Sequence, residues 1–172
     1  MQIAVIAIFQ TTSGKDNIMS DLRIPYHSLS IDAYRGLVAA GTALEQSPLG
    51  KTLIDFVFLR VSQINGCAFC IDKHARDLLR QGEDFQRINS LSTWRETGFY
   101  SERERAALAW AEAATRLANG EVPDRVFLTL KAHFSDQEIA DLGFAVAVMN
   151  AFNRLAIGFK QPVKVVSLAV AG

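Results

Sequence analysis

Hydrophobic positions along the chain recur three and four residues apart, which is the spacing of one face of an α-helix. Long helices are predicted over residues 31–46, 51–64, 67–81, 102–117, 123–133 and 136–159, with one or two helical turns within 84–95. The alternation of apolar and polar residues that marks a strand does not appear along the chain. The pattern therefore predicts an all-α fold built as a single domain.

Capping residues support several of these boundaries. Ser101 with Glu104, and Ser135 with Glu138, have the spacing of a capping box at the start of a helix. Gly82 is typical of the residue just past a helix end, where the backbone turns left-handed. The helices at 102–117, 136–159 and 67–81 are thus bounded by the residue types that their ends require.

The helix at 51–64 is apolar almost all round, so we expect it to be buried on several sides. Ser47-Pro48 separates it from the preceding helix, and we expect Pro48 at its first position, where the missing N–H is not needed. Asn65-Gly66 interrupts the chain after it. Ser30 is the expected N-cap of the helix at 31–46.

The ends of the chain differ from the middle. Residues 1–19 are expected to form a poorly ordered extension, residues 20–161 the helical domain and residues 162–172 a tail. The apolar run at 3–9 is too short to span a bilayer and has no positive residue before it, as a signal peptide would. We therefore expect a soluble cytoplasmic protein, with a short docked strand or helix as the alternative for the extension.

Composition narrows the classes of partner. The chain has 172 residues, of which 49% are hydrophobic, and its 18 basic residues balance its 18 acidic residues. A chain without net charge lacks the field that draws proteins to nucleic acid or to anionic membranes. We expect neither as a partner.

Candidate chemistry is concentrated in residues 65–74, which read NGCAFCIDKH and contain both cysteines of the chain. Two cysteines are too few for a secreted disulfide framework, so a close pair indicates redox or metal chemistry. Cys67, Cys70 and His74 are three and four residues apart and share one stripe of a helix. Cys67 falls in the first turn, where unpaired N–H groups and the helix dipole lower a thiol pKa. The spacing also allows a disulfide.

A proton path can be built around this pair. A neutral His74 lies one turn beyond Cys70 and can accept its proton. Asp55 is the only acidic residue within 52–64, and Arg60 is expected to point to another side of that helix. We therefore expect Asp55 to be buried without a cation, with a pKa raised toward neutrality, as suits a relay.

Other interpretations of the same residues remain. The pair could be half of a zinc site, with His74 and Asp55 as further ligands, although structural zinc usually takes four Cys or His ligands. The cysteines could simply fill the core. Asp55 could simply bind a neighbouring backbone group.

Two further groups of polar residues each have more than one interpretation. The residues Trp94, Arg95 and Glu96 could line the mouth of the site, although packing and ion pairing are favoured. The residues Asn150, Asn153 and Arg154 share one face of an apolar helix, and helix or subunit contacts are favoured for them over catalysis.

The stretch RVSQINGCAFCIDKHARDL resembles the alkylhydroperoxidase D-like branch of the carboxymuconolactone decarboxylase family. The family pattern is an acidic residue, eleven intervening residues and then C-x-x-C-x-x-x-H, and counting back from Cys67 places the acid at Asp55. The segments LSTWRET, SERERAALAWAEA, HFSDQEIADL and NAFNRLAI are similar too. The resemblance covers about residues 21–160.

This resemblance implies an alkylhydroperoxidase D-like helical fold and a thiol peroxidase without haem, flavin or metal. Cys70 would be the peroxidatic thiol, and Cys67 would be the resolving thiol that meets the reductant. His74 and Asp55 would form the proton relay. The implied substrate is a hydroperoxide, the implied reductant is a dithiol or a lipoyl- or thioredoxin-like protein, and the implied assembly is a trimer or hexamer.

Two positions depart from the family pattern. The acid is usually Glu, and Asp55 is one methylene shorter. The best-studied members have His before the second cysteine, where this chain has Phe69, so their lipoyl-type reductant does not transfer directly. A lactone enzyme or a redox-sensing disulfide module on the same fold are the alternative functions. An organic hydroperoxide is weakly favoured by the apolar residues expected around the pair, namely Phe56, Phe58, Phe69 and Ile71.

Overall fold

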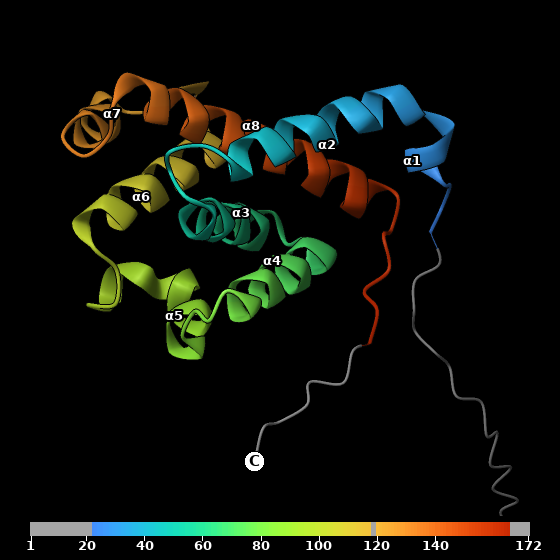
Figure 1. Cartoon of the computed structure of the whole chain (residues 1–172), viewed down its shortest axis with the longest axis horizontal. Coiled ribbons are helices and arrows are strands. Elements are labelled where there is room, and N and C mark those ends of the chain that lie inside the picture. The colour runs from blue at the N-terminus through green and yellow to red at the C-terminus, as the bar shows by residue number, and fades with distance from the viewer. Residues whose placement is uncertain (1–21, 118–119, 166–172) are drawn as a thin grey trace, which may run out of the picture.

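The computed structural model describes residues 22–117 and 120–165, and every regular element within them is a helix, as the sequence predicts. Figure 1 shows their arrangement. The α-helices are α1 (Tyr26–Leu29), α2 (Ile31–Glu45), α3 (Lys51–Asn65), α4 (Ala68–Arg80), α5 (Phe85–Ser90), α6 (Glu102–Arg116), α7 (Asp124–Lys131) and α8 (Asp136–Gly158). A 3-10 helix, η1 (Leu91–Glu96), follows α5 directly. The expected extension at 1–19 and most of the tail at 162–172 lie outside the described residues.

Helix α3 is the centre of the fold. Every residue from Leu53 to Ser62 is buried, as expected for a helix that is apolar almost all round. Figure 1 shows α3 between α2 and α8 on one side and α4 on the other, and α6 also packs against it. Any side chain on α3 is therefore held by neighbours on several sides, which suits it to carry a fixed catalytic group.

The predicted caps are present. Both capping boxes form, with the serine oxygen accepting the N–H of the glutamate and the glutamate accepting the serine N–H, at Ser101 with Glu104 and at Ser135 with Glu138. Gly82 adopts φ 82°, and Glu83 N–H donates to the Leu78 carbonyl at 3.1 Å, which closes the end of α4. The α4 helix therefore ends where the glycine predicts.

One predicted helix start is wrong, and one predicted N-cap lacks its side-chain hydrogen bond. Helix α3 begins at Lys51 rather than Pro48, because Gly50, with φ 81°, is its N-cap. Pro48 lies instead in a turn that is closed by Gly50 N–H donating to the Ser47 carbonyl at 3.1 Å. Ser30 precedes α2, but its side chain makes no capping hydrogen bond. A proline preceded by serine fits a turn as well as a helix start, so the pattern alone does not decide between them.

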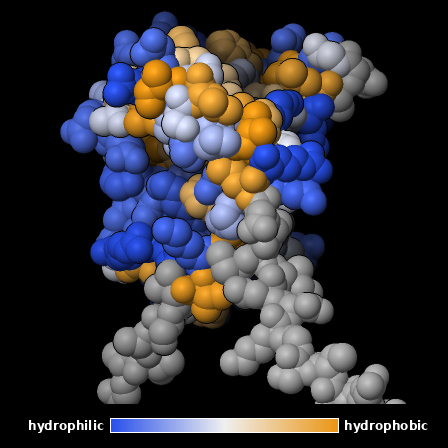
Figure 2. Space-filling view, turned by 90° about the vertical axis from the view of Figure 1, so that its right-hand side faces the viewer, coloured by the Kyte–Doolittle hydropathy of each residue, from blue (hydrophilic) through white to orange (hydrophobic). Residues whose placement is uncertain are grey.

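Helix α8 is long and apolar enough by composition to cross a membrane, but half of its most apolar window is buried against the rest of the protein. That is the behaviour of a core helix. Figure 2 shows apolar surface gathered on the face where α1 and the end of α8 lie. Exposed apolar residues in these helices include Leu29 and Ile157, and Ile24 before α1 and Ile31 at the start of α2 are exposed as well.

Candidate functional site

The two helices that carry the site are joined by one left-handed residue. Helix α3 ends at Asn65, and Gly66 follows with φ 71°, a conformation that favours glycine. The next N–H, that of Cys67, donates to the Ser62 carbonyl at 3.0 Å and closes the end of α3. Because this turn folds α4 back against α3, Asp55 on α3 comes to face His74 on α4.

Cys67 is the N-cap of α4. Its sulfur accepts the Cys70 N–H at 3.4 Å, so it occupies the position usually held by a serine or aspartate oxygen. The thiol and the N–H of Cys70, with smaller contributions from the amides of Asn153 and Phe69, outweigh the effect of burial and lower the pKa of Cys67 to about 7. The expectation of an acidic thiol at the helix start therefore agrees with the local geometry.

Cys70 behaves in the opposite way. The adjacent Cys67 sulfur and burial both raise the pKa of the Cys70 thiol. Both cysteines are free thiols and almost fully buried. In the reduced pair, Cys67 is therefore the more acidic of the two thiols.

His74 is a buried neutral base. Its Nδ1 lies 3.2 Å from Oδ1 of Asp55, and since a carboxylate can only accept, Nδ1 carries the hydrogen. That tautomer leaves the Nε2 lone pair available for a proton. Burial lowers the pKa of His74, although the hydrogen bond to Asp55 acts to raise it. The rings of Phe58 and His74 pack edge to face, with their centroids 5.1 Å apart.

The expectation that Asp55 lacks a cation is wrong. Lys51, four residues earlier on α3, donates to its Oδ2 at 2.8 Å, and Gln81 donates to the same oxygen at 2.6 Å. These bonds and the one from His74 outweigh burial and lower the pKa of Asp55. The carboxylate is therefore ionised, and it orients His74 rather than holding a proton itself.

The structure does not gather a zinc site around the cysteines. Among the described residues, the metal-ligand atoms that lie within 4.8 Å of one another belong to Asp55, His74 and Asp77. Neither cysteine is in that group. Lys51 and Lys73 bond to its two carboxylates, and their positive charges oppose a bound cation there.

A cavity of about 240 Å³ opens onto Cys70 and His74. Cys67 is not among its lining residues, so a ligand in the cavity meets Cys70 first. Phe58 and Phe69 line it as expected. The other lining residues are Tyr26, Tyr34, Val38, Gly41, Thr42, Glu45, Lys73, Met149, Phe152 and Ala156.

The expectation that Phe56 and Ile71 surround the cysteines is wrong. Phe56 instead packs in a second apolar cluster, with its ring 6.0 Å from that of Tyr100 and the Arg87 guanidinium 4.9 Å away. Ile71 packs against the same cluster. Helix rotation explains this, because Phe56 lies two positions from Phe58 and Ile71 lies one position from Cys70, so both face elsewhere.

Asn153 on α8 is a site residue that sequence reasoning placed elsewhere. It is fully buried, its Oδ1 accepts from Asn65 at 2.9 Å and its Nδ2 donates to the Ser62 hydroxyl at 3.1 Å. Its amide also lowers the pKa of both cysteines. The expected helix contact is present, and the same amide also influences the ionisation of the thiols. Only the packing of α8 against the α3–α4 turn reveals that second role.

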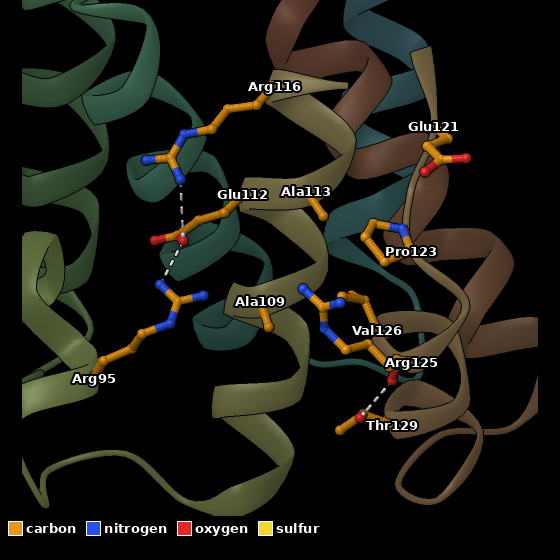
Figure 3. Close-up of a pocket in the computed structure, with 10 residues that line it drawn as sticks. All are labelled: Arg95, Ala109, Glu112, Ala113, Arg116, Glu121, Pro123, Arg125, Val126 and Thr129. Atoms are coloured by element: carbon orange, nitrogen blue, oxygen red, sulfur yellow. Dashed lines mark hydrogen bonds and ion pairs between the residues drawn. The ribbon is translucent and has the colours of Figure 1, made fainter. Parts of the chain in front are cut away.

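The residues near Trp94 do not reach the thiol cavity. Trp94 Nε1 donates to Glu112 at 3.0 Å, and the Arg95 guanidinium donates to the same carboxylate at 2.5 Å. Figure 3 shows Arg95 and Arg116 converging on Glu112 beside a separate cavity of about 570 Å³ between α6 and α7. Packing and ion pairing, the favoured interpretation for Trp94 and Arg95, match these contacts.

Comparison with known proteins agrees with this fold and site. Residues 32–113 match the family model of the carboxymuconolactone decarboxylase family. The chain is 34% identical over 135 residues to an uncharacterized protein, YdfG, of Bacillus subtilis, covering 78% of this chain and 92% of that protein. The chain belongs to the carboxymuconolactone decarboxylase family, in its alkylhydroperoxidase D-like branch.

Two solved structures are also similar. The structure of Atu0492 from Agrobacterium tumefaciens, of unknown function and provisionally described as the antioxidant defence protein AhpD, shares 40% identity. It superposes with a TM-score of 0.81 over 85% of this chain and all of that one. An uncharacterized peroxidase-related protein from Silicibacter sp. TM1040 shares 25% identity with a TM-score of 0.68, over 76% of this chain and 69% of that one.

Proposed function

We propose that this protein is a thiol-dependent reductase of organic hydroperoxides. The observation that carries the proposal is the position of Cys70, which lies at a cavity wall beside His74 and one helical turn from a second thiol. A peroxide in this cavity contacts a sulfur nucleophile and a neutral base together, and the partner thiol is in the same helix turn.

The first step needs a thiolate at Cys70. Its proton moves to the Cys67 thiolate or to Nε2 of His74, a residue that lines the same cavity as Cys70. The Cys70 sulfur then attacks the terminal peroxide oxygen, and the O–O bond breaks. The alkoxide that leaves takes up one proton to become the alcohol, and Cys70 becomes a sulfenic acid. Asp55 keeps His74 in the tautomer that this transfer requires.

The second step uses Cys67. Its sulfur attacks the Cys70 sulfenic acid as the thiolate, and a disulfide forms. The hydroxide that leaves takes a proton from His74 or from solvent and becomes water. An external dithiol then reduces the disulfide through a mixed disulfide and supplies the two electrons of the cycle. We assign no metal, haem or flavin to these steps, and the reductant is a dithiol or a lipoyl- or thioredoxin-like protein.

The similarity to peroxidase-related proteins and to a provisional antioxidant defence protein supports this proposal. The apolar face beside α1 and the end of α8 supports self-association into a trimer or hexamer, since exposed apolar patches of this kind mark contact surfaces. A cytoplasmic location fits the need for a pool of reducing thiols.

The test is turnover of tert-butyl hydroperoxide with dithiothreitol or dihydrolipoamide. We expect Cys70→Ser to abolish turnover, and Cys67→Ser and Asp55→Ala to reduce it. Equal rates in all variants and the wild type would end the proposal. A lactone enzyme would retain its own activity when both cysteines are serine, and a redox sensor would form the disulfide without consuming peroxide continuously.

A further inference from the structure

The walls of the cavity over Cys70 include several aromatic rings. Five of them come from five different helices, α1, α2, α3, α4 and α8, and they belong to Tyr26, Tyr34, Phe58, Phe69 and Phe152. The Tyr34 and Phe152 rings meet edge to face at 6.3 Å, which holds part of this wall in one arrangement. Aromatic walls bind flat aromatic ligands well because edge-to-face and offset-stacked contacts add to simple apolar burial.

The size of the cavity restricts what enters it. Its volume of about 240 Å³ is smaller than the roughly 300–1,000 Å³ usual for sites that bury a drug-sized ligand. A single ring with a short substituent fits such a space, whereas a long acyl chain would have to remain largely outside. The cavity therefore favours a compact ligand.

Charge restricts the ligand further. Two permanently charged residues line the cavity, and both have partners: Lys73 bonds to Asp77 at 2.6 Å, and Glu45 lies 3.5 Å from Lys51. A carboxylate or phosphate on the ligand would have to compete with Asp77 for Lys73. An uncharged ligand avoids that competition and also the cost of desolvating its own charge.

Gly41 on α2 lines the same cavity as the Cys70 thiol. A Cβ built on it would lie 3.9 Å from Cε2 of Phe152, an ordinary contact, so a larger side chain would extend into the cavity without meeting the backbone. Glycine is unfavourable inside a helix by about 1 kcal/mol relative to alanine. Its presence at a lining position of α2 thus keeps room for a ligand at the expense of helix stability.

We propose that the cavity of Phe58, Phe69, Tyr34 and Phe152 selects a compact, uncharged aromatic hydroperoxide, and that Gly41 is a specificity-determining residue. This inference rests on the proposed function. The bound ring lies against the aromatic walls and presents its peroxide group to Cys70. It leaves as the corresponding alcohol when Cys70 is oxidised to the sulfenic acid.

The experiment compares kcat/KM for cumene hydroperoxide and tert-butyl hydroperoxide with dithiothreitol as reductant. The wild type is expected to prefer the aromatic peroxide by about tenfold or more, the range that apolar pocket contacts provide. Gly41→Leu is expected to remove this preference by lowering kcat/KM for cumene hydroperoxide alone. Gly36→Leu is the matched control, because Gly36 lies on the exposed side of the same helix with nothing within 4 Å of an added Cβ.

The outcomes separate the two proposals. If the wild type reduces neither peroxide, the proposed function fails. If it reduces both with equal kcat/KM, or if Gly41→Leu lowers both equally while Gly36→Leu does not, the function stands and the aromatic selectivity is wrong. Gly41→Ala provides the check on folding, since it should raise the melting temperature while narrowing the cavity only slightly.

Discussion

Asp55 and Glu112 are both buried carboxylates, and they lie in two differently constructed regions. Asp55 is bonded to a lysine, a glutamine and a histidine. Glu112 is bonded to Trp94 and to guanidinium groups, among them the buried Arg60 at 2.6 Å. The pKa of each carboxyl is lowered against the effect of burial.

The difference lies in what the neighbours can do. An arginine does not release its proton in a protein, so Glu112 is locked in a permanent ion-pair cluster that ties α6 to α3 and η1. Asp55 has a histidine neighbour that can gain a proton and that itself borders a thiol. Burial and a low pKa therefore do not distinguish a structural carboxylate from a catalytic one, whereas the chemistry of its partners does.

The largest expected effect is on stability, at Glu112. Glu112→Gln leaves the buried Arg60 without its counter-charge, and breaking such a pair costs about 3–5 kcal/mol. The free energy of unfolding, measured by urea titration, should fall by that amount, while kcat/KM of the remaining folded protein stays within a factor of two or so. Asp32→Asn, which removes an exposed partner of Arg35, is the control and should change neither quantity. A large loss of peroxide turnover in folded Glu112→Gln would contradict the purely structural role assigned to Glu112.

The next effect is on catalysis, at His74. His74→Gln keeps a polar side chain facing Asp55 but removes the proposed general base, and loss of such a group typically lowers the rate by about 10²-fold or more. The measurement is kcat/KM for tert-butyl hydroperoxide across pH. His133→Gln on the exposed surface is the matched control. Unchanged kcat/KM in His74→Gln would remove the imidazole from the proton path.

A smaller catalytic effect is expected at Asp55. Asp55→Asn retains the shape of the side chain, but its amide can no longer hold His74 in one tautomer. Because Asp55 acts through His74, kcat/KM should fall by no more than in His74→Gln. Asp55→Glu restores the charge and the family's usual side-chain length, and it should recover activity if the buried space admits one methylene. If Asp55→Asn and Asp55→Glu lose activity equally, the carboxylate of Asp55 acts through packing rather than through His74.

The pKa values of the two thiols provide a further test of the region around Asp55. In the wild type, absorbance of the reduced protein should show one thiolate forming near pH 7, at Cys67, and the other at a much higher pH. Cys67→Ser keeps a good N-cap for α4 and removes the neighbouring negative charge, so the pKa of Cys70 should fall toward its ordinary value. A Cys70 pKa that does not move would show that burial alone raises it.

The smallest effect concerns acid stability. The pKa of His74 is lowered in the folded state, so below about pH 6.5 the unfolded chain binds a proton that the folded chain does not. The free energy of unfolding should therefore decrease as pH falls below that value, by at most about 1.4 kcal/mol per pH unit from this group. The lowered pKa of Asp55 adds a further loss only below about pH 4. His74→Gln should lack the first of these two slopes.

Local signals predicted much of the fold. Helical periodicity and the capping residues at Ser101, Ser135 and Gly82 act within one or two turns, and these predictions are confirmed. Pro48 is a counterexample, since its preference for the first helical position also suits a turn. The short helix α1 was not predicted, because four residues carry too little periodicity to be recognised.

The site was only partly predictable. The spacing of Cys67, Cys70 and His74 follows from one helix, and Lys51 could have been recognised as a partner of Asp55 from its i, i+4 spacing. Gln81 could not, since its bond to Asp55 depends on how α3 and α4 pack across the left-handed turn. The cavity walls from α1, α2 and α8 depend in the same way on contacts between distant segments.

The N-cap position of Cys67 links the order of a helix to the reduction potential. In the proposed cycle, the thiolate accepts the Cys70 N–H at the start of α4, and this sulfur loses its negative charge when the disulfide forms. An N-cap typically contributes about 1 kcal/mol to the stability of its helix, and here it would stabilise the dithiol form alone. For a two-electron couple this shifts the potential by about 20 mV toward a more oxidising disulfide. A given external dithiol would then favour the reduced pair by about a further fivefold at equilibrium, since tenfold corresponds to about 30 mV for two electrons.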